Sequence, residues 1–363
     1  MNIITQIFRY ATGLLFIFSG LIKLNDPVGT QIKFEEYFEV FAVDFAPFFH
    51  TLVPLALPLA LVLCVAEVVL GVALLLQFEM RLTTWALLLL IGFFTFLTFY
   101  SAAFDKVTDC GCFGDAVKLT PWQSFTKDVV LLVMIAVLFA RRKHLRSRLP
   151  AAVNWSALGV VTALSFAVGA YAIRYLPPLD FRAYRVGADL PALMEPSAAL
   201  KYSYVMLRDG RQEVLDAYPT DTAYVYKDII LRNPEALPKI TDYRVWNDEG
   251  DFTEATFEGK KLLIVIHSAE DTKLDRYPAV RELVEALPTD VEPMVLTAAD
   301  RTRFEALRHE VQLAVPYYFA DGTVLKTMIR NNPGLILLEE GVVVDKWSPH
   351  RLPTAEGLTT AGR

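Results

Sequence analysis

Residues 82–104 read LTTWALLLLIGFFTFLTFYSAAF and contain no charged side chain. A helix needs about 20 mostly apolar residues to cross a membrane. Four further apolar stretches of similar length occupy the first half of the chain: Ile3–Leu24, Thr51–Leu76, Pro121–Ala140 and Ala151–Ile173. Five such runs in one half of a chain favour a membrane protein over a soluble protein with buried helices. The sequence therefore predicts five membrane-spanning helices.

The composition changes near Leu176 and divides the chain into two parts. Of its 363 residues, 54% are hydrophobic, and the mean hydropathy is +0.35. Soluble domains contain about 45–50% apolar residues. The excess of apolar residues in this chain lies before the break. Most of the 41 Asp and Glu residues follow the break. The net charge of −6, with a single dense basic stretch, argues against nucleic acid as a partner.

The orientation in the membrane follows from the basic stretch Arg141–Arg148, between the fourth and fifth apolar runs. Short loops rich in Lys and Arg stay on the cytoplasmic side of a membrane. This rule places the N-terminus in the cytoplasm. It places the acidic loop after the first run, the loop with Cys110 and Cys112, and everything after Arg174 on the opposite side. The first run lacks a small-residue cleavage site, which predicts a retained helix and not a cleaved signal peptide.

Glu67 is the one acidic residue deep inside a predicted span. Ionisable residues at such a depth pair with one another and mark functional sites. Arg9 lies at a similar depth in the first span, so we expect these two side chains to pair. Two interpretations remain open: a structural tie between the first two spans, or a site for protons or a quinone. Lys23, at the other end of the first span, is expected to extend to the lipid headgroups.

Residues 108–115 read TDCGCFGD, with Cys110 and Cys112 separated by one residue. A Cys-x-Cys pair is too tight for a complete zinc site, and no further Cys or His lies near it in sequence, so we expect no metal. In an oxidising compartment the pair favours a dithiol or a strained, reactive disulfide, and Gly111 supplies the backbone freedom. Two packed thiols or a static disulfide remain alternatives. Cys64, in an apolar run, is interpreted as a packing residue.

Two stretches of the first helix and its loop, RYATGLLF (residues 9–16) and SGLIKLNDP (residues 19–27), resemble the opening of the DoxX family of small four-helix membrane proteins. Glu67 with Gly71 fits the same pattern. The stretch Cys110–Gly114 resembles the branch that contains the methylamine-utilisation protein MauE. The resemblance covers about residues 1–140. It implies a redox-associated protein of the bacterial cell envelope, concerned with the thiol–disulfide state of partner proteins.

The segments predict a sequence of domains. We expect a four-helix membrane domain at residues 1–148, a fifth membrane helix and linker at 149–178, a small β-containing connector at 179–240, a globular domain at 241–350 and a flexible tail at 351–363. From residue 242 the pattern is hairpin, strand, helix, strand, helix and hairpin. This order predicts an α/β domain with a mixed sheet, built around the buried-strand run Leu262–Ile266.

The order of elements resembles the thioredoxin fold of the TlpA and peroxiredoxin-like branch, over about residues 241–347. The resemblance places Pro333 at the position of that family's cis-proline. It places His267–Asp271 where an active thioredoxin carries Cys-x-x-Cys, and no cysteine follows Cys112. Thiol–disulfide exchange needs a thiolate, so this domain cannot perform it. We interpret His267 as a strand-end residue and the domain as a binding module.

Two functions are compatible with these patterns. In the first, Cys110 and Cys112 act as the redox pair of a thiol–disulfide oxidoreductase component, exchanging with a periplasmic thiol-containing protein or with a quinone. In the second, the chain is a non-enzymatic scaffold or assembly factor whose thioredoxin-like domain binds a client protein. Both imply a multi-pass protein of the bacterial inner membrane, with a cytoplasmic N-terminus and a periplasmic C-terminal domain. None of the five histidines lies within a predicted span, so we expect no haem.

Overall fold

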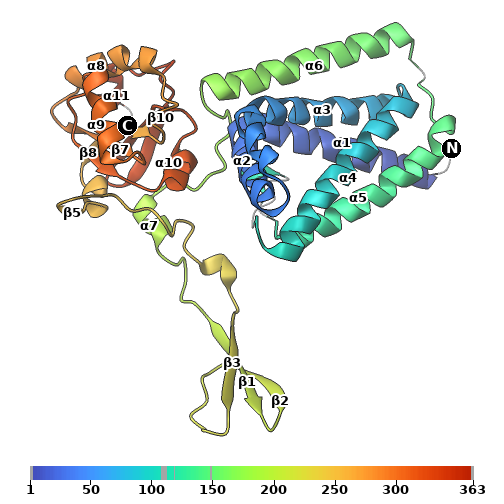
Figure 1. Ribbon diagram of the computed structural model, residues 1–363, viewed down its shortest axis with the longest axis horizontal. Coiled ribbons are helices and arrows are strands. Elements are labelled where there is room, and N and C mark those ends of the chain that lie inside the picture. The colour runs from blue at the N-terminus through green and yellow to red at the C-terminus, as the bar shows by residue number, and fades with distance from the viewer. Residues whose placement is uncertain (1–2, 108–112, 118, 148, 361–363) are drawn as a thin grey trace. The chain divides into compact units, whose positions relative to one another are not determined.

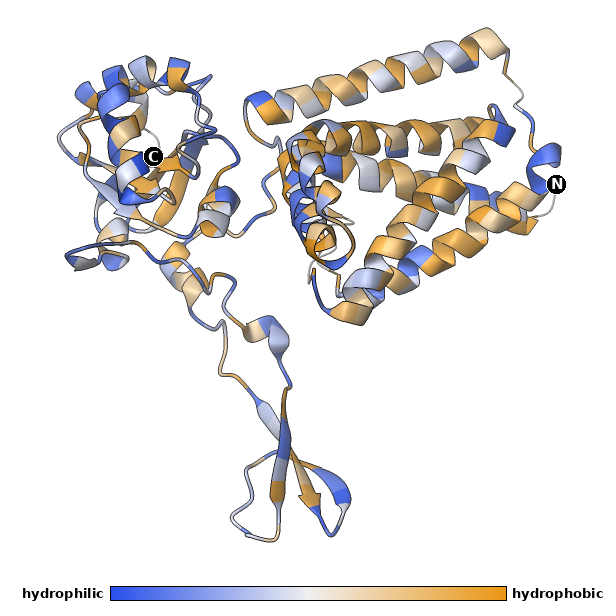
Figure 2. Cartoon of the chain, in the orientation of Figure 1, coloured by the Kyte–Doolittle hydropathy of each residue, from blue (hydrophilic) through white to orange (hydrophobic). Residues whose placement is uncertain are grey.

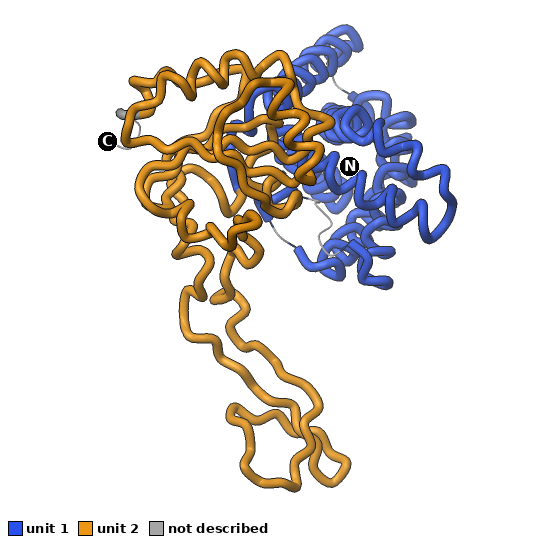
Figure 3. Tube along the Cα trace, turned by 60° about the vertical axis from the view of Figure 1, so that its left-hand side comes forward, with its two compact units in different colours: residues 1–181 blue, residues 182–363 orange. Residues whose placement is uncertain are grey.

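The computed structural model describes residues 3–107, 113–117, 119–147 and 149–360. The chain divides into two compact units, residues 1–181 and 182–363, which are coloured separately in Figure 3. Each unit has a hydrophobic core of its own and is described by itself.

The first unit is built from helices (Figure 1). Its α-helices are α1 (Ile3–Asn25), α2 (Pro27–Asp44), α3 (Ala56–Leu76), α4 (Met80–Phe104), α5 (Pro121–Arg141) and α6 (Ala151–Arg174), with short 3-10 helices η1 (Pro47–Leu55), η2 (Gly114–Ala116) and η3 (Arg142–His144). By length and composition, five helices in the described part of the chain are able to cross a membrane: α1, α4, α6, α3 with η1, and α5 with η3. Figure 2 shows the hydrophobic residues along them. Each of the five apolar runs in the sequence forms one of these helices.

Helix α2 occupies the acidic segment after the first apolar run, which was expected to be a loop, so that expectation was wrong. The carboxylate of Asp26 accepts a hydrogen bond from the Gly29 amide at 3.0 Å, and Pro27 is the first helical residue, which together start the helix. Tyr37 and Phe41 are buried against α4. The apolar side of α2 is narrow, and its many acidic residues conceal the helical period.

Helices α1 and α3 approach each other closely because glycines line their contact. A Cβ atom on Gly71 would lie 2.8 Å from the backbone oxygen of Gly13, and one on Gly20 would lie 2.9 Å from that of Cys64. The two helices are therefore antiparallel, with Gly13 opposite Gly71 and Gly20 opposite Cys64. Small residues at such contacts let membrane helices pack backbone to backbone.

An apolar cluster runs along the helical unit, from the middle of its helices toward the end where α3 ends and α4 begins. Its buried members are Phe16, Leu74, Met80, Leu87, Ile91, Leu131, Ile135, Leu138 and Leu145. Along the buried side of α1, Thr5, Arg9 and Thr12 precede Phe16, whereas Ser19 and Lys23 follow it. The buried polar side chains of α1 thus form two groups, one on each side of Phe16.

The second unit contains a seven-stranded sheet in the order β10-β9-β6-β7-β8-β4-β5. Its strands are β4 (Trp246–Asn247), β5 (Gly250–Asp251), β6 (Lys260–Ile266), β7 (Val291–Thr297), β8 (Tyr317–Phe319), β9 (Gly334–Glu339) and β10 (Val342–Trp347). Strands β6, β7 and β8 are parallel, β9 is antiparallel to β6, and β10 is antiparallel to β9. This confirms a mixed α/β domain after the membrane helices.

Helices α8 (Tyr277–Glu285), α9 (Arg301–Glu310), α10 (Gly322–Met328) and α11 (Ala355–Thr360) accompany the sheet. Strand β6 is buried along its length from Lys261 to Ile266, as expected of a central strand covered on both faces. Residues 187–190 run beside β10: the Gly187 amide donates to the Val343 carbonyl at 2.7 Å, and the Val343 amide donates to the Ala188 carbonyl at 2.8 Å. This segment covers the edge of the sheet.

A separate three-stranded antiparallel sheet lies within the stretch that the sequence assigns to a β-containing connector. Its strands are β1 (Tyr202–Arg208), β2 (Arg211–Leu215) and β3 (Val225–Leu231), in the order β2-β1-β3. The segments before β1 and after β3 are joined by hydrogen bonds, such as that from the Ser197 amide to the Ala236 carbonyl at 3.0 Å.

Candidate functional site

A buried ion pair joins the first two membrane-type helices of the bundle. Lys23 Nζ of α1 lies 2.5 Å from Glu67 Oε1 of α3, and the two side chains are 6% and 1% exposed. Lys23 Nζ also lies 4.5 Å from the centre of the Phe94 ring of α4, a cation–π contact. The expectation that Lys23 extends to the lipid headgroups was therefore wrong. Its side chain ends inside the protein.

The structure corrects the partner expected for Glu67. Arg9 donates from Nη1 to the Leu75 carbonyl at 3.0 Å, beside the C-terminal end of α3. Helical side chains point toward the N-terminus of their own helix. In the antiparallel α1–α3 pair, Arg9 and Glu67 therefore point to opposite ends of the bundle. Lys23 and Glu67 point toward each other, at the level where Gly20 faces Cys64.

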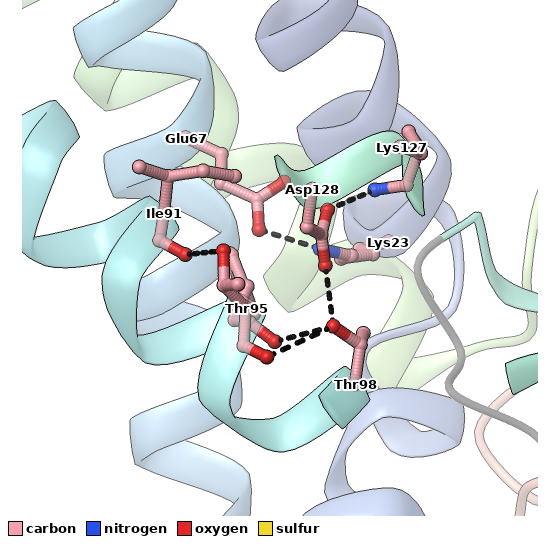
Figure 4. A network of polar contacts seen from close by, with 8 residues as sticks. Lys23, Glu67, Ile91, Thr95, Thr98, Lys127 and Asp128 are labelled. Carbon is pink, nitrogen blue, oxygen red and sulfur yellow. Dashed lines mark hydrogen bonds and ion pairs between the residues drawn. The ribbon is translucent and has the colours of Figure 1, made fainter. Parts of the chain in front are cut away.

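A second buried acid lies beside this pair, on α5. Asp128 is 1% exposed, its Oδ1 lies 2.5 Å from Lys127 Nζ, and its Oδ2 accepts a hydrogen bond from Thr98 Oγ1 at 3.0 Å. Phe94 and Thr98 are one turn apart on α4, so they lie on the same side of that helix. Side chains of α4 therefore contact both Lys23 and Asp128. Figure 4 shows the Thr98–Asp128 hydrogen bond next to the Lys23–Glu67 ion pair.

We call Lys23, Glu67, Thr98, Lys127 and Asp128 the buried charged cluster. It lies at the end of the bundle where α1 and α4 end and α5 begins. Arg9 lies toward the other end of α1.

The segment that carries Cys110 and Cys112 enters and leaves the bundle at this same end. Cys110 and Cys112 lie outside the described residues. Before them, Val107 is fully buried in a cluster with Tyr37 and Leu97. After them, the ring of Phe113 lies 5.3 Å from Lys127 Nζ, a member of the buried charged cluster. The described flanks of the cysteine segment therefore contact the end of the bundle that holds the cluster.

A family comparison covers this part of the chain. Residues 1–141 match the family model described as methylamine utilisation protein MauE. We refer to residues 1–141 as the MauE-like region; its helices are able to span a membrane. No curated protein and no solved structure matches the chain.

The buried charged cluster of the MauE-like region has unused hydrogen-bonding capacity. Glu67 Oε2 has no hydrogen-bond partner among the described residues. Because an unpaired charge is costly inside a membrane, Lys23 neutralises Glu67 at close range, and Lys127 does the same for Asp128. Cys64, one turn before Glu67, is buried and carries a free thiol. The described residues contain no group of three or more His, Cys, Asp and Glu side chains suited to a metal ion.

Sequence reasoning identified Glu67 but not its partners. Lys23 and Asp128 lie near the ends of their apolar runs, where a charge is commonly explained by contact with headgroups or water. Lys23 and Asp128 are buried because α1, α4 and α5 pack together, and no local sequence pattern predicts that packing. The usable signal was the helical spacing of the polar residues in the first run, Thr5, Arg9, Thr12, Ser19 and Lys23, which marks one side of α1.

The second unit has its own polar group at the carboxyl end of β6. Burial, followed by the nearby Lys326 charge, lowers the pKa of His267 from 6.5 to about 4, and the His267 ring hydrogen-bonds the Arg330 backbone. Asn332 Nδ2 donates to the Ser268 carbonyl at 2.5 Å, and the Asn332–Pro333 peptide is cis. His267 is thus a partly buried histidine at a strand end.

Proposed function

We propose that the MauE-like region is a membrane redox unit in which Cys110 and Cys112 undergo thiol–disulfide exchange. The reduced pair would break two S–H bonds and form one S–S bond. The two electrons and two protons would pass to a disulfide of a partner protein, which becomes two thiols, or to a quinone, which becomes a hydroquinone. The similarity of residues 1–141 to MauE is the observation that carries this proposal.

The buried charged cluster supports the same proposal. Thiol exchange runs through a thiolate, and a nearby cation favours the thiolate over the thiol. Lys127 contacts the ring of Phe113, the residue that directly follows Cys112 in the sequence. A cation held by Asp128 is therefore available at the flank of the cysteine pair.

We further propose the orientation predicted from the basic stretch Arg141–Arg148, in a bacterial inner membrane. The N-terminus would be cytoplasmic, and the cysteine pair and the second unit would be periplasmic. The DoxX-like opening of the first helix is consistent with this setting.

The second unit is proposed to be a thioredoxin-like domain that binds the client. The strand and helix order around β6, with the antiparallel hairpin β9–β10 at its edge, supports that fold. Because no cysteine follows Cys112, the domain would recruit a thiol protein and leave the exchange to Cys110 and Cys112.

The test is the redox state of the pair in native membranes. A Cys64→Ser background leaves Cys110 and Cys112 as the only thiols. These are alkylated with a reagent of known mass before and after addition of a membrane-impermeant reductant. We expect a shift of two reagent masses, and a mixed disulfide with the client in Cys112→Ser. A pair that stays in one state under all conditions contradicts the proposal.

The alternative is a scaffold or assembly factor without redox chemistry. It is favoured by the cysteine-free second unit, which would bind a client whatever the state of the membrane thiols. The double variant Cys110→Ser, Cys112→Ser separates the two functions. A redox unit loses its activity in that variant, whereas a scaffold retains client binding and the cellular phenotype.

A further inference from the structure

The three-stranded sheet carries a groove lined by tyrosines. The groove has a volume of about 630 Å³, within the range of roughly 300–1,000 Å³ that is usual for ligand sites. Its lining includes Tyr202 and Tyr204 of β1 and Tyr218, which follows β2. The rings of Tyr204 and Tyr218 meet edge to face at 5.3 Å, and Tyr218 is 59% exposed. Aromatic side chains therefore form an accessible wall.

A polar network forms the other part of the groove. Arg232 Nε donates to Ser203 Oγ at 2.7 Å, and Ser203 Oγ donates to Asp216 Oδ1 at 2.9 Å. Ser203 is fully buried, so this network is fixed in place. The guanidinium of Arg232 has no further side-chain partner among the described residues. Two cations, Lys201 and Arg232, and one carboxylate line the groove, which makes it net positive.

The strand order restricts what the groove can bind. Strand β1 pairs with β3 from Tyr202 and with β2 only from Tyr204, so beside the groove just two of its residues keep a free edge, which is too short for a peptide to add as a further strand. A bound helix needs a long apolar groove, whereas this lining mixes tyrosines with charged groups. A polyproline II segment needs no backbone ladder, loses little entropy on binding and packs its rings on aromatic side chains.

We propose that this groove binds a proline-rich extended segment of a partner protein that carries an acidic residue for Arg232. The tyrosines would contact the proline rings, and the free fork of the guanidinium would pair with the carboxylate. The residues are distinct from those of the redox proposal, so either proposal can fail alone.

The probe is a fluorescent seven-residue peptide of prolines with one central aspartate, added to the full-length protein in detergent. Fluorescence anisotropy reports binding. We expect saturable binding, about tenfold weaker binding of a Gly/Ser peptide with the same aspartate, and several-fold weaker binding of the proline peptide with Asn in place of Asp. Absence of saturable binding at millimolar protein, or equal binding of the Gly/Ser peptide, would overturn the proposal.

Variants assign the site. Tyr218→Ala should weaken binding about tenfold, and Tyr218→Phe should restore most of it, because the ring is retained. Tyr226→Ala is the matched control: Tyr226 is 49% exposed on β3 of the same sheet but does not line the groove. Equal losses in Tyr218→Ala and Tyr226→Ala would contradict this site.

Arg232→Gln tests the charge. We expect it to abolish the preference for the aspartate peptide over the asparagine peptide while the asparagine peptide binds as in the unmodified protein. The asparagine peptide thus reports whether the sheet still folds. A preference that survives Arg232→Gln in a protein that binds the asparagine peptide normally would refute the role of Arg232. If Arg232→Gln binds neither peptide, the single variant Lys201→Gln provides the test instead. Because Arg232 is intact in Lys201→Gln, that variant should still bind the aspartate peptide more tightly than the asparagine peptide.

Discussion

Lys23 and Glu67 form a buried ion pair between α1 and α3, with Nζ and Oε1 2.5 Å apart. The pair exists because two antiparallel helices direct these side chains toward each other where glycines bring the backbones together. Within a membrane-type bundle, each charge is tolerable only while the other is present. This mutual dependence is directly measurable.

Removing one charge should destabilise the protein far more than removing both. We expect Glu67→Leu or Lys23→Met alone to lower the free energy of unfolding by about 3–5 kcal/mol, because the remaining charge is buried without a partner. The double variant should recover most of that loss. Thermal unfolding in detergent, followed by tryptophan fluorescence, measures the difference. Lys33→Met, which breaks the more exposed Lys33–Glu36 pair, is the control and should cost less than about 1 kcal/mol.

The spacing of α1 and α3 predicts a different response at two glycines. In Gly71→Ala the new methyl group would lie 2.8 Å from the Gly13 carbonyl oxygen and 3.1 Å from the Ile17 amide, so the helices must separate, at a cost of about 1–3 kcal/mol. Gly92→Ala meets no atom within 4 Å and should be neutral or stabilising. Unfolding of both variants in detergent checks this, and equal effects would contradict close packing at Gly71.

The parts of the fold that were predictable from sequence have local signals. A long uncharged run is sufficient to predict a membrane-type helix. Short apolar runs that alternate with Gly-containing turns were sufficient to predict β6, β7 and the β9–β10 hairpin. Helix α2 was missed because Tyr37 and Phe41 bury only a narrow side of an acidic segment. Strand β8 and helix α10 were missed because each is short: Tyr317–Phe319 and Gly322–Met328.

The candidate site was predictable only in part, for a physical reason. An acidic residue inside an apolar run is conspicuous in the sequence, and Glu67 was identified for this reason. The partner of Glu67 depends on the direction of each helix and on the tilt of its side chains toward the helix N-terminus. Counting residues from the helix ends gives the depth of a residue but takes no account of this tilt. That omission produced the incorrect Arg9 pairing. Asp128 is visible in the sequence, but its contact with Thr98 requires the α4–α5 packing.

Three cations hold the C-terminal end of α10, and two of them, Arg182 and Lys346, are buried. Lys346 Nζ donates to the Met328 carbonyl at 2.7 Å, while Arg182 and Arg330 donate to the carbonyls of Thr327 and Lys326. Lys346→Met should leave the Met328 carbonyl without this donor and cost about 1–3 kcal/mol. Chemical denaturation of the full chain in detergent, monitored in the second unit by hydrogen exchange of α10, measures the loss. Exposed Lys227, replaced by Met, is the control, and a similar loss there would argue against this role.

The histidine at the end of β6 predicts a pH dependence of stability. The pKa of His267 is lowered from 6.5 to about 4, first by burial and then by Lys326, whereas Asp271 opposes the shift. Between these values the unfolded chain binds a proton that the folded domain does not. The stabilising contribution is therefore complete above about pH 6.5 and is lost as the pH falls toward 4, by roughly 3 kcal/mol. His267→Gln should flatten the unfolding profile of the second unit between pH 6.5 and 4. His309→Gln, at a position 84% exposed, should leave the profile unchanged. A profile with the same slope in His267→Gln would show that another group carries the dependence.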